Sequence, residues 1–199
     1  MPADAAETAP APAREVLAFW FAGENASRWF AADPAFDAAI RARFAATHAA
    51  AARGELDGWC ATPEGWLALL IVLDQFSRNL YRGDARAFAC DARAQALAVA
   101  GLARGDDGRL PRPWRAFAYL PLEHAEDPEL QRQSVARFRA LAEQAPSAER
   151  ARYDGYLDYA LRHGAVVARY GRFPHRNAAL GRADTPDERD YLAQPGAGF

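Results

Sequence analysis

No lysine occurs in this sequence, so arginine supplies all 24 of its basic residues. The absence excludes mechanisms that need a lysine amine, which include Schiff-base catalysis, pyridoxal-phosphate aldimines and the lysine of a phosphate-binding loop. Because 26 acidic residues bring the formal net charge to -2, the chain offers no broad positive field for a phosphate backbone. We therefore expect no nucleic-acid partner.

Cysteine and long apolar runs are also scarce. Cys60 and Cys90 are the only cysteines, and their wide separation fits neither a metal-binding motif nor the disulfide framework of a small secreted protein. The longest apolar run covers residues 66–73 and is too short to cross a bilayer. The N-terminal stretch carries acidic side chains where a signal peptide would carry basic ones, and it lacks an apolar core. The sequence therefore predicts a cytoplasmic location and no membrane partner.

Length and composition allow one sizeable core, since the chain has 199 residues and is 51% hydrophobic. We predict a disordered N-terminal tail over residues 1–13 and a single helical domain over residues 14–199. No segment shows the alternation of a convincing strand. Because the connections between predicted helices are short, the sequence predicts an all-α fold of antiparallel helical hairpins.

Four helix starts are marked by an N-capping side chain followed by proline: Asp33-Pro34, Thr62-Pro63, Asp127-Pro128 and Thr185-Pro186. Apolar residues at helical spacing predict helices over residues 16–21, 34–53, 63–79, 92–104, 113–120, 128–144 and 149–170. Gly54, Gly105 and Gly171 are suited to end three of these helices.

A first polar cluster ends the helix predicted to start at Pro63, which is otherwise apolar on every face. Its members are Asp74, Gln75, Arg78, Asn79 and Arg82. Buried polar groups need partners, and one interpretation is a structural network in which Asp74 pairs with Arg78. The other is a pocket in which Arg78 and Arg82 present donors to a carboxylate or phosphate.

A second polar cluster follows the predicted helix 149–170 and consists of Arg172, His175, Arg176 and Asn177. The proline before His175 stiffens the segment, so the side chains are held in place. His175 has the chemistry of a general base or of a neutral hydrogen-bond donor, although a structural role is the commoner one for a lone histidine.

A third segment, residues 119–127, contains Glu123 and His124 between two predicted helices. Both side chains are of kinds that bind divalent ions, but the helical pairings His-x-x-x-His and Glu-x-x-His are missing from the sequence. We therefore expect no metal and no other cofactor. His48 and His163 lie in helical patterns, where packing or solvent exposure explains them. If the protein is an enzyme, His175 and His124 are the candidates for proton transfer.

Four blocks of the sequence, residues 16–21, 73–83, 119–127 and 171–177, together resemble the bacterial family called domain of unknown function 924. The resemblance covers nearly the whole chain after the tail. It implies an all-helical fold of the tetratricopeptide-like superfamily type. It brings no established reaction, and the likeness to peptide-binding helical repeats is an analogy of fold.

The leading hypothesis is that the two polar clusters, with Glu123 and His124, line one pocket for a small polar or anionic molecule. The alternative is a scaffold that binds a peptide or protein, in which the polar groups only lock the helices together. A further hypothesis concerns the C-terminal stretch 194–199: we expect Phe199 either to dock into a groove of the protein or to fray.

Overall fold

The computed structural model describes residues 8–198, which form α-helices, short 3₁₀ turns and one π-helical segment, with no strand among them. The all-α prediction is confirmed. These residues group into two compact units, and each is described by itself. Unit 1 contains the described residues up to Arg82 together with Arg86–Ala118, and unit 2 contains Gly83–Ala85 together with the described residues from Tyr119 onward. That the chain forms a single domain stays a prediction.

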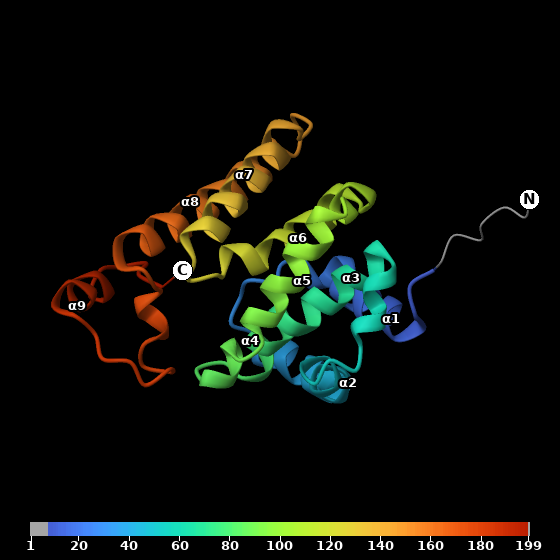
Figure 1. Cartoon of the computed structure of the whole chain (residues 1–199), viewed down its shortest axis with the longest axis horizontal. Helices are drawn as coiled ribbons and strands as arrows, with labels where there is room; N and C mark the ends of the chain where they lie inside the picture. The colour runs from blue at the N-terminus through green and yellow to red at the C-terminus, as the bar shows by residue number, and fades with distance from the viewer. Residues whose placement is uncertain (1–7, 199) are drawn as a thin grey trace, which may run out of the picture. The chain divides into compact units, whose positions relative to one another are not determined.

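The helices of unit 1 are α1 (Ala11–Trp20), α2 (Pro34–Ala52), α3 (Pro63–Leu70), α4 (Ser77–Leu80) and α5 (Asp91–Ala103), and α6 (Arg112–Glu123) contributes residues to both units (Figure 1). Because α1 begins at Ala11 and buries Ala13, the predicted tail is too long by three residues. Residues 1–7 of that tail lie outside the described part of the chain.

All four predicted caps accept hydrogen bonds from the first turn of a helix. Asp33 accepts from Phe36, and Thr62 accepts from Gly65. Asp127 caps the helix that starts at Pro128, and Thr185 forms a reciprocal capping box with Glu188. Gly54, Gly105 and Gly171, at the predicted helix ends, adopt positive φ angles of 84°, 74° and 70°. Local capping chemistry therefore determined these helix boundaries.

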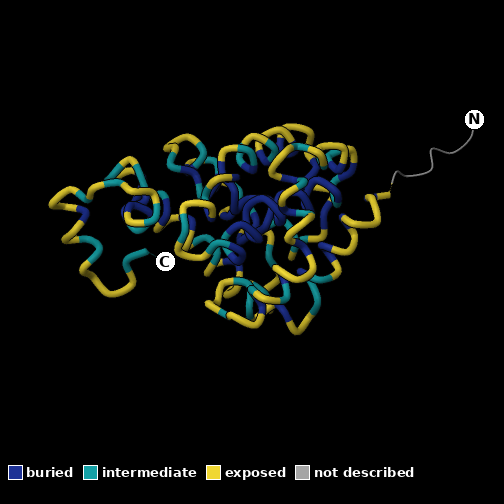
Figure 2. Tube along the Cα trace, turned by 90° about the horizontal axis from the view of Figure 1, so that it is seen from below, coloured by how far each residue is buried: buried dark blue, intermediate teal, exposed yellow. Residues whose placement is uncertain are grey.

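The predicted helix 63–79 is a continuous helical path, but it changes form on the way. Between α3 and α4 the segment Ile71–Phe76 is π-helical. Residues 65–77 are all buried (Figure 2), so this path runs through the core of unit 1. A π-helical stretch holds more residues per turn than an α-helix and is often found at functional sites.

Aromatic side chains fill much of the core of unit 1. Trp20 contacts Phe36, Phe76 and Phe117, with ring centroids 5.5–5.7 Å apart. Elsewhere in this unit the indole of Trp66 on α3 is packed against α5 so closely that a Cβ on Gly101 would lie 2.1 Å from its ring. Only glycine permits this approach.

Unit 2 contains α7 (Pro128–Glu143), α8 (Arg150–Tyr170) and α9 (Pro186–Leu192). Helices α7 and α8 lie side by side and are joined by the short segment 144–149, so they form a helical hairpin (Figure 1). After α8 the chain turns at Gly171, makes a short 3₁₀ turn over Pro174–Arg176 and continues to α9. Within the described residues no helix is both long and apolar enough to span a membrane.

Candidate functional site

The first polar cluster forms a dense ion network within unit 1. Asp74 is almost fully buried and lies 2.9 Å from Nη1 of Arg78, and Gln75 donates to its other oxygen at 2.6 Å. The same guanidinium donates to both carboxylate oxygens of Asp91, each at 3.1 Å. Burial alone would lower the pKa of Arg78, but the charges of Asp74 and Asp91 outweigh it and raise the pKa. Arg78 is thus held between two carboxylates.

The other two members of this cluster converge on a carboxylate of α2. Asn79 donates to Asp37 at 2.8 Å, and Arg82 donates to both oxygens of Asp37 at 3.0 and 3.1 Å. The charges of Arg78 and Arg82 are therefore both met by carboxylates of this unit. These contacts favour the structural network over the pocket as the interpretation of the first cluster.

His48 and Ser77 form a further buried polar pair beside this network. Ser77 donates to the carbonyl of Leu73 at 2.5 Å, so its oxygen accepts from Nε2 of His48 at 2.8 Å. Burial lowers the pKa of His48, and burial also raises the pKa of the neighbouring Cys90 thiol. A thiol with a raised pKa is a poor nucleophile. The buried contact between His48 and Ser77 joins α2 to α4 within unit 1.

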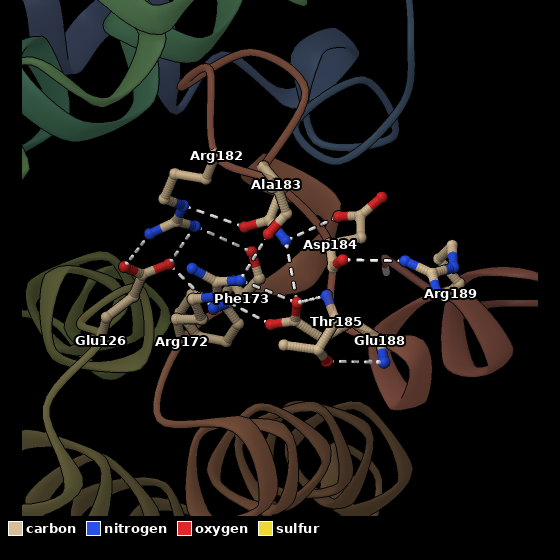
Figure 3. Close-up of polar contacts among 10 residues, drawn as sticks. Glu126, Arg172, Phe173, Arg182, Ala183, Asp184, Thr185, Glu188 and Arg189 are labelled. Atoms are coloured by element: carbon tan, nitrogen blue, oxygen red, sulfur yellow. Dashed lines mark hydrogen bonds and ion pairs between the residues drawn. The ribbon is translucent and has the colours of Figure 1, made fainter.

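The second cluster contains a second ion network, which lies in unit 2 and is drawn in Figure 3. Arg172 donates to both oxygens of Glu188 at 2.7 and 2.8 Å. Asn177 donates to Asp184 at 2.7 Å and accepts from Arg182 at 2.9 Å. These side chains tie the segment after α8 to the start of α9. Arg172 and Asn177, predicted as ligand-binding residues, have structural partners here.

Glu126 lies in the segment before α7 and belongs to the same network. Arg182 donates to both of its oxygens, at 2.6 and 2.8 Å, and the backbone N–H of Phe173 donates at 2.8 Å (Figure 3). Burial alone would raise the pKa of Glu126, but these hydrogen bonds outweigh it and lower the pKa. Hydrogen bonds from Arg172 lower the pKa of Glu188 to about 2. Both carboxylates are therefore ionised at neutral pH.

Three further predicted residues of unit 2, His124, His175 and Arg176, lie together with His163 and Phe173. We call His124, His163, Phe173, His175 and Arg176 the histidine cluster. The ring centroids of His124 and His163 are 6.1 Å apart, and Phe173 lies 5.5 Å from His163 and 5.6 Å from His175. The guanidinium of Arg176 lies 4.5 Å from the centroid of Phe173. Three of the four histidines in the chain are thus in one place.

His163 is held in an orientation that leaves it neutral. Its Nδ1 lies 2.9 Å from the carbonyl of Tyr159 and 3.4 Å from Oε1 of Glu123. Because a carbonyl only accepts, Nδ1 carries the proton. Burial first, and then the neighbouring His124, lower the pKa of His163 to about 3. At neutral pH the ring therefore keeps an unprotonated nitrogen.

The backbone around His124 is fixed from both sides. Arg176 donates to the carbonyl of His124 at 3.0 Å. The side-chain amide of Gln131 on α7 donates to the carbonyls of Glu123 and Ala125, at 2.6 and 2.7 Å. The position of His124 is thus set by hydrogen bonds from two separate elements of unit 2.

Several members of these clusters were not predicted from the sequence, namely Asp37, Asp91, His163, Arg182, Asp184 and Glu188. Most of them lie far along the chain from at least one partner. No local spacing identifies such pairs, because the contacts depend on how helices and loops pack. The capping box between Thr185 and Glu188 was the one available signal, and it predicts a helix start only.

The comparisons with known proteins agree with this fold. A family model described as bacterial protein of unknown function (DUF924) matches residues 16–196, so the chain belongs to this family. A solved structure, of the protein of unknown function ATU0120 from Agrobacterium tumefaciens, is similar at 40% sequence identity with a TM-score of 0.83. The match covers 92% of this chain and 97% of that chain. No curated protein matches. The tetratricopeptide-like arrangement stays a prediction.

Proposed function

We propose that this protein binds a small polar or anionic ligand at the histidine cluster of unit 2. The observation that carries the proposal is that three of the four histidines lie in one series of ring contacts, from His124 through His163 and Phe173 to His175, with Arg176 over the ring of Phe173. A neutral imidazole offers one donor and one acceptor, and a guanidinium offers planar donors to a carboxylate or phosphate. Such a combination suits a ligand with an anionic group.

The two ion networks support this choice by contrast. Arg78, Arg82, Arg172 and Arg182 each face a carboxylate of their own unit, so their charge is used to hold the fold. The predicted residues that remain for a ligand site are therefore Glu123, His124, His175 and Arg176. His163 is added to them.

A thermal-shift titration tests the proposal. The purified full chain would be melted with inorganic phosphate, with succinate and with neither, and the same series would be run on His175→Gln. We expect one probe to raise the melting temperature of the natural protein and to lose most of this effect in the variant. Arg82→Gln is the matched control, because Arg82 is half exposed and lies in unit 1. An equal shift in His175→Gln, or no shift with either probe, would overturn the proposal.

A second candidate function, peptide binding, is favoured by a groove on the α7–α8 hairpin. It has a volume of about 400 Å³ and is lined mainly by Pro128, Val135, Leu161, Gly164, Ala165 and Ala168, together with Gln131 and Arg132. Leu161 is 45% exposed, which leaves an apolar side chain for a partner to cover. Selection from a displayed peptide library tests this function. Binding that Ala165→Arg abolishes would support it, and an empty selection would reject it.

A further inference from the structure

Three side chains of the kinds that bind metal ions lie together in unit 2. Glu123 ends α6, His124 follows it directly, and His163 comes from α8. Each offers one ligand atom, and these atoms all lie within 4.8 Å of one another. Glu123 and His163 are only 4% and 7% exposed, so an ion there would be largely shielded from water.

We propose that Glu123, His124 and His163 form a binding site for a divalent transition-metal ion of the zinc class. Two imidazole nitrogens and one carboxylate oxygen are a ligand set that suits zinc, and they are too few and too nitrogen-rich for calcium or magnesium. A site with three protein ligands leaves the fourth tetrahedral position open. The ion would then present one free position to a ligand.

The surroundings hold these three residues in advance of binding. The carbonyl of Tyr159 accepts from Nδ1 of His163 at 2.9 Å, and this leaves the other ring nitrogen with its lone pair. The amide of Gln131 and the guanidinium of Arg176 fix the backbone of residues 123–125. Such outer partners orient the side chains that bind a metal and raise the affinity of the site for the ion.

The metal site deepens the proposed function, and its role in anion binding rests on that function, because the ion would lie in the same cluster. Arg176 donates to the backbone carbonyl of His124 at 3.0 Å, so its positive charge lies in the same cluster as the ion. An anionic group that completes the coordination would interact with both charges. The ligand class favoured by this arrangement is a small carboxylate or phosphate that binds the ion directly.

Zinc titration by calorimetry tests the metal site. The full chain would be treated with a chelator, desalted and titrated with zinc chloride alone in a buffer without phosphate. We expect one equivalent to bind the natural protein and the affinity to fall by at least about 10-fold in Glu123→Gln and in His124→Gln. Circular dichroism would confirm that both variants are folded. Cobalt in place of zinc should give the visible absorption of a four-coordinate ion, which both variants should lose.

The matched control is His48→Gln, since His48 is a buried histidine of unit 1 with a hydrogen bond to Ser77. It should bind zinc like the natural protein. Failure of zinc to bind, or equal binding by Glu123→Gln, His124→Gln and the natural protein, would overturn the metal site. Phosphate or succinate binding without zinc binding would remove the metal site alone. Zinc binding with no anion binding would leave the metal site in place and overturn the proposed function.

Discussion

Arg182 and Glu126 form a two-pronged ion pair across 56 residues of sequence, with N–O distances of 2.6 and 2.8 Å. Arg182 also donates to the carbonyl of Phe173 at 3.1 Å, and Glu126 accepts from the backbone N–H of the same residue. The pair therefore encloses the backbone of Phe173 from two sides. The ring at the centre of the histidine cluster is positioned by an ion pair outside that cluster.

Arg182→Ala should destabilise the protein by about 2–3 kcal/mol, because Glu126 would lose two hydrogen bonds from a charged donor. Each such bond is worth about 1.5–3 kcal/mol when buried, and the partial exposure of both side chains reduces this value. Urea unfolding measures this as a fall in midpoint at unchanged slope. Arg189→Ala is the control, since Arg189 is exposed and donates to one backbone carbonyl. Equal midpoints for the two variants would show that the ion pair contributes little.

Arg78→Ala should cost about 3–5 kcal/mol, because it leaves the buried carboxylates of Asp74 and Asp91 facing each other without their shared cation. Arg82→Ala should cost less than about 1 kcal/mol, because its side chain is 47% exposed and Asp37 keeps its bond from Asn79. Chemical denaturation followed by tryptophan fluorescence compares the two. An Arg78→Ala protein as stable as the natural one would contradict the structural network and favour a ligand pocket at the first cluster.

Acid should weaken the protein partly through Glu188. Hydrogen bonds from Arg172 hold its folded pKa at about 2, below the ordinary value of 4.5. A carboxylate whose pKa is lower in the folded protein than in the unfolded chain stabilises the fold at pH values above its ordinary pKa of 4.5. This stabilisation is lost as the pH falls from 4.5 towards 2. The difference in unfolding midpoint between the natural protein and Glu188→Gln should therefore shrink over this range. Asp187→Asn, at an exposed neighbour, is the matched control.

Two glycine-to-alanine changes should have opposite effects. Gly101→Ala should destabilise by at least about 1–3 kcal/mol, since its Cβ would lie 2.1 Å from the ring of Trp66. Gly155→Ala in α8 should stabilise by up to about 1 kcal/mol, because nothing lies within 4 Å of the added Cβ and alanine favours a helix. Melting temperatures measure both. A Gly101→Ala protein as stable as the natural one would contradict the close packing of α3 and α5.

The last described residues touch the histidine cluster. A Cβ on Gly198 would lie 3.1 Å from Cβ of His175, so the chain passes beside this side chain. Phe199, whose docking was a hypothesis from the sequence, lies outside the described residues. Deleting residues 195–199 should make His175 react faster with diethyl pyrocarbonate, as mass spectrometry would show. An unchanged rate would mean that this segment does not shield the ring.

The sequence was sufficient for most of the fold because helix ends depend on local chemistry. Asp33, Thr62, Asp127 and Thr185 each cap a helix as their spacing predicts. The π-helical segment was not predicted, since a buried run that is apolar apart from Asp74 and Gln75 carries no periodicity that separates one helical form from another. Helix boundaries are local properties, whereas the form of a buried helix depends on its neighbours.

The candidate site was harder to predict, because it depends on contacts between distant segments. The pair Asp74 and Arg78 follows from their spacing on one helix. Asp91, which competes for the same guanidinium, lies on another helix and gave no signal. His163 was assigned to packing for the same reason, although it lies beside Glu123 and His124. Spacing identifies partners within an element, and only the fold identifies partners between elements.

The π-helical segment Ile71–Phe76 has a consequence for insertions and deletions. A π-helical turn holds one residue more than an α-helical turn, so removing one residue would allow a regular α-helix from Pro63 onward that keeps the downstream side chains on nearly the same faces. Arg78 would then still face Asp91, and Asn79 would still face Asp37. An inserted residue has no such compensation and would rotate everything downstream by about 100°. Unit 1 should therefore tolerate the loss of one residue from this segment better than the gain of one.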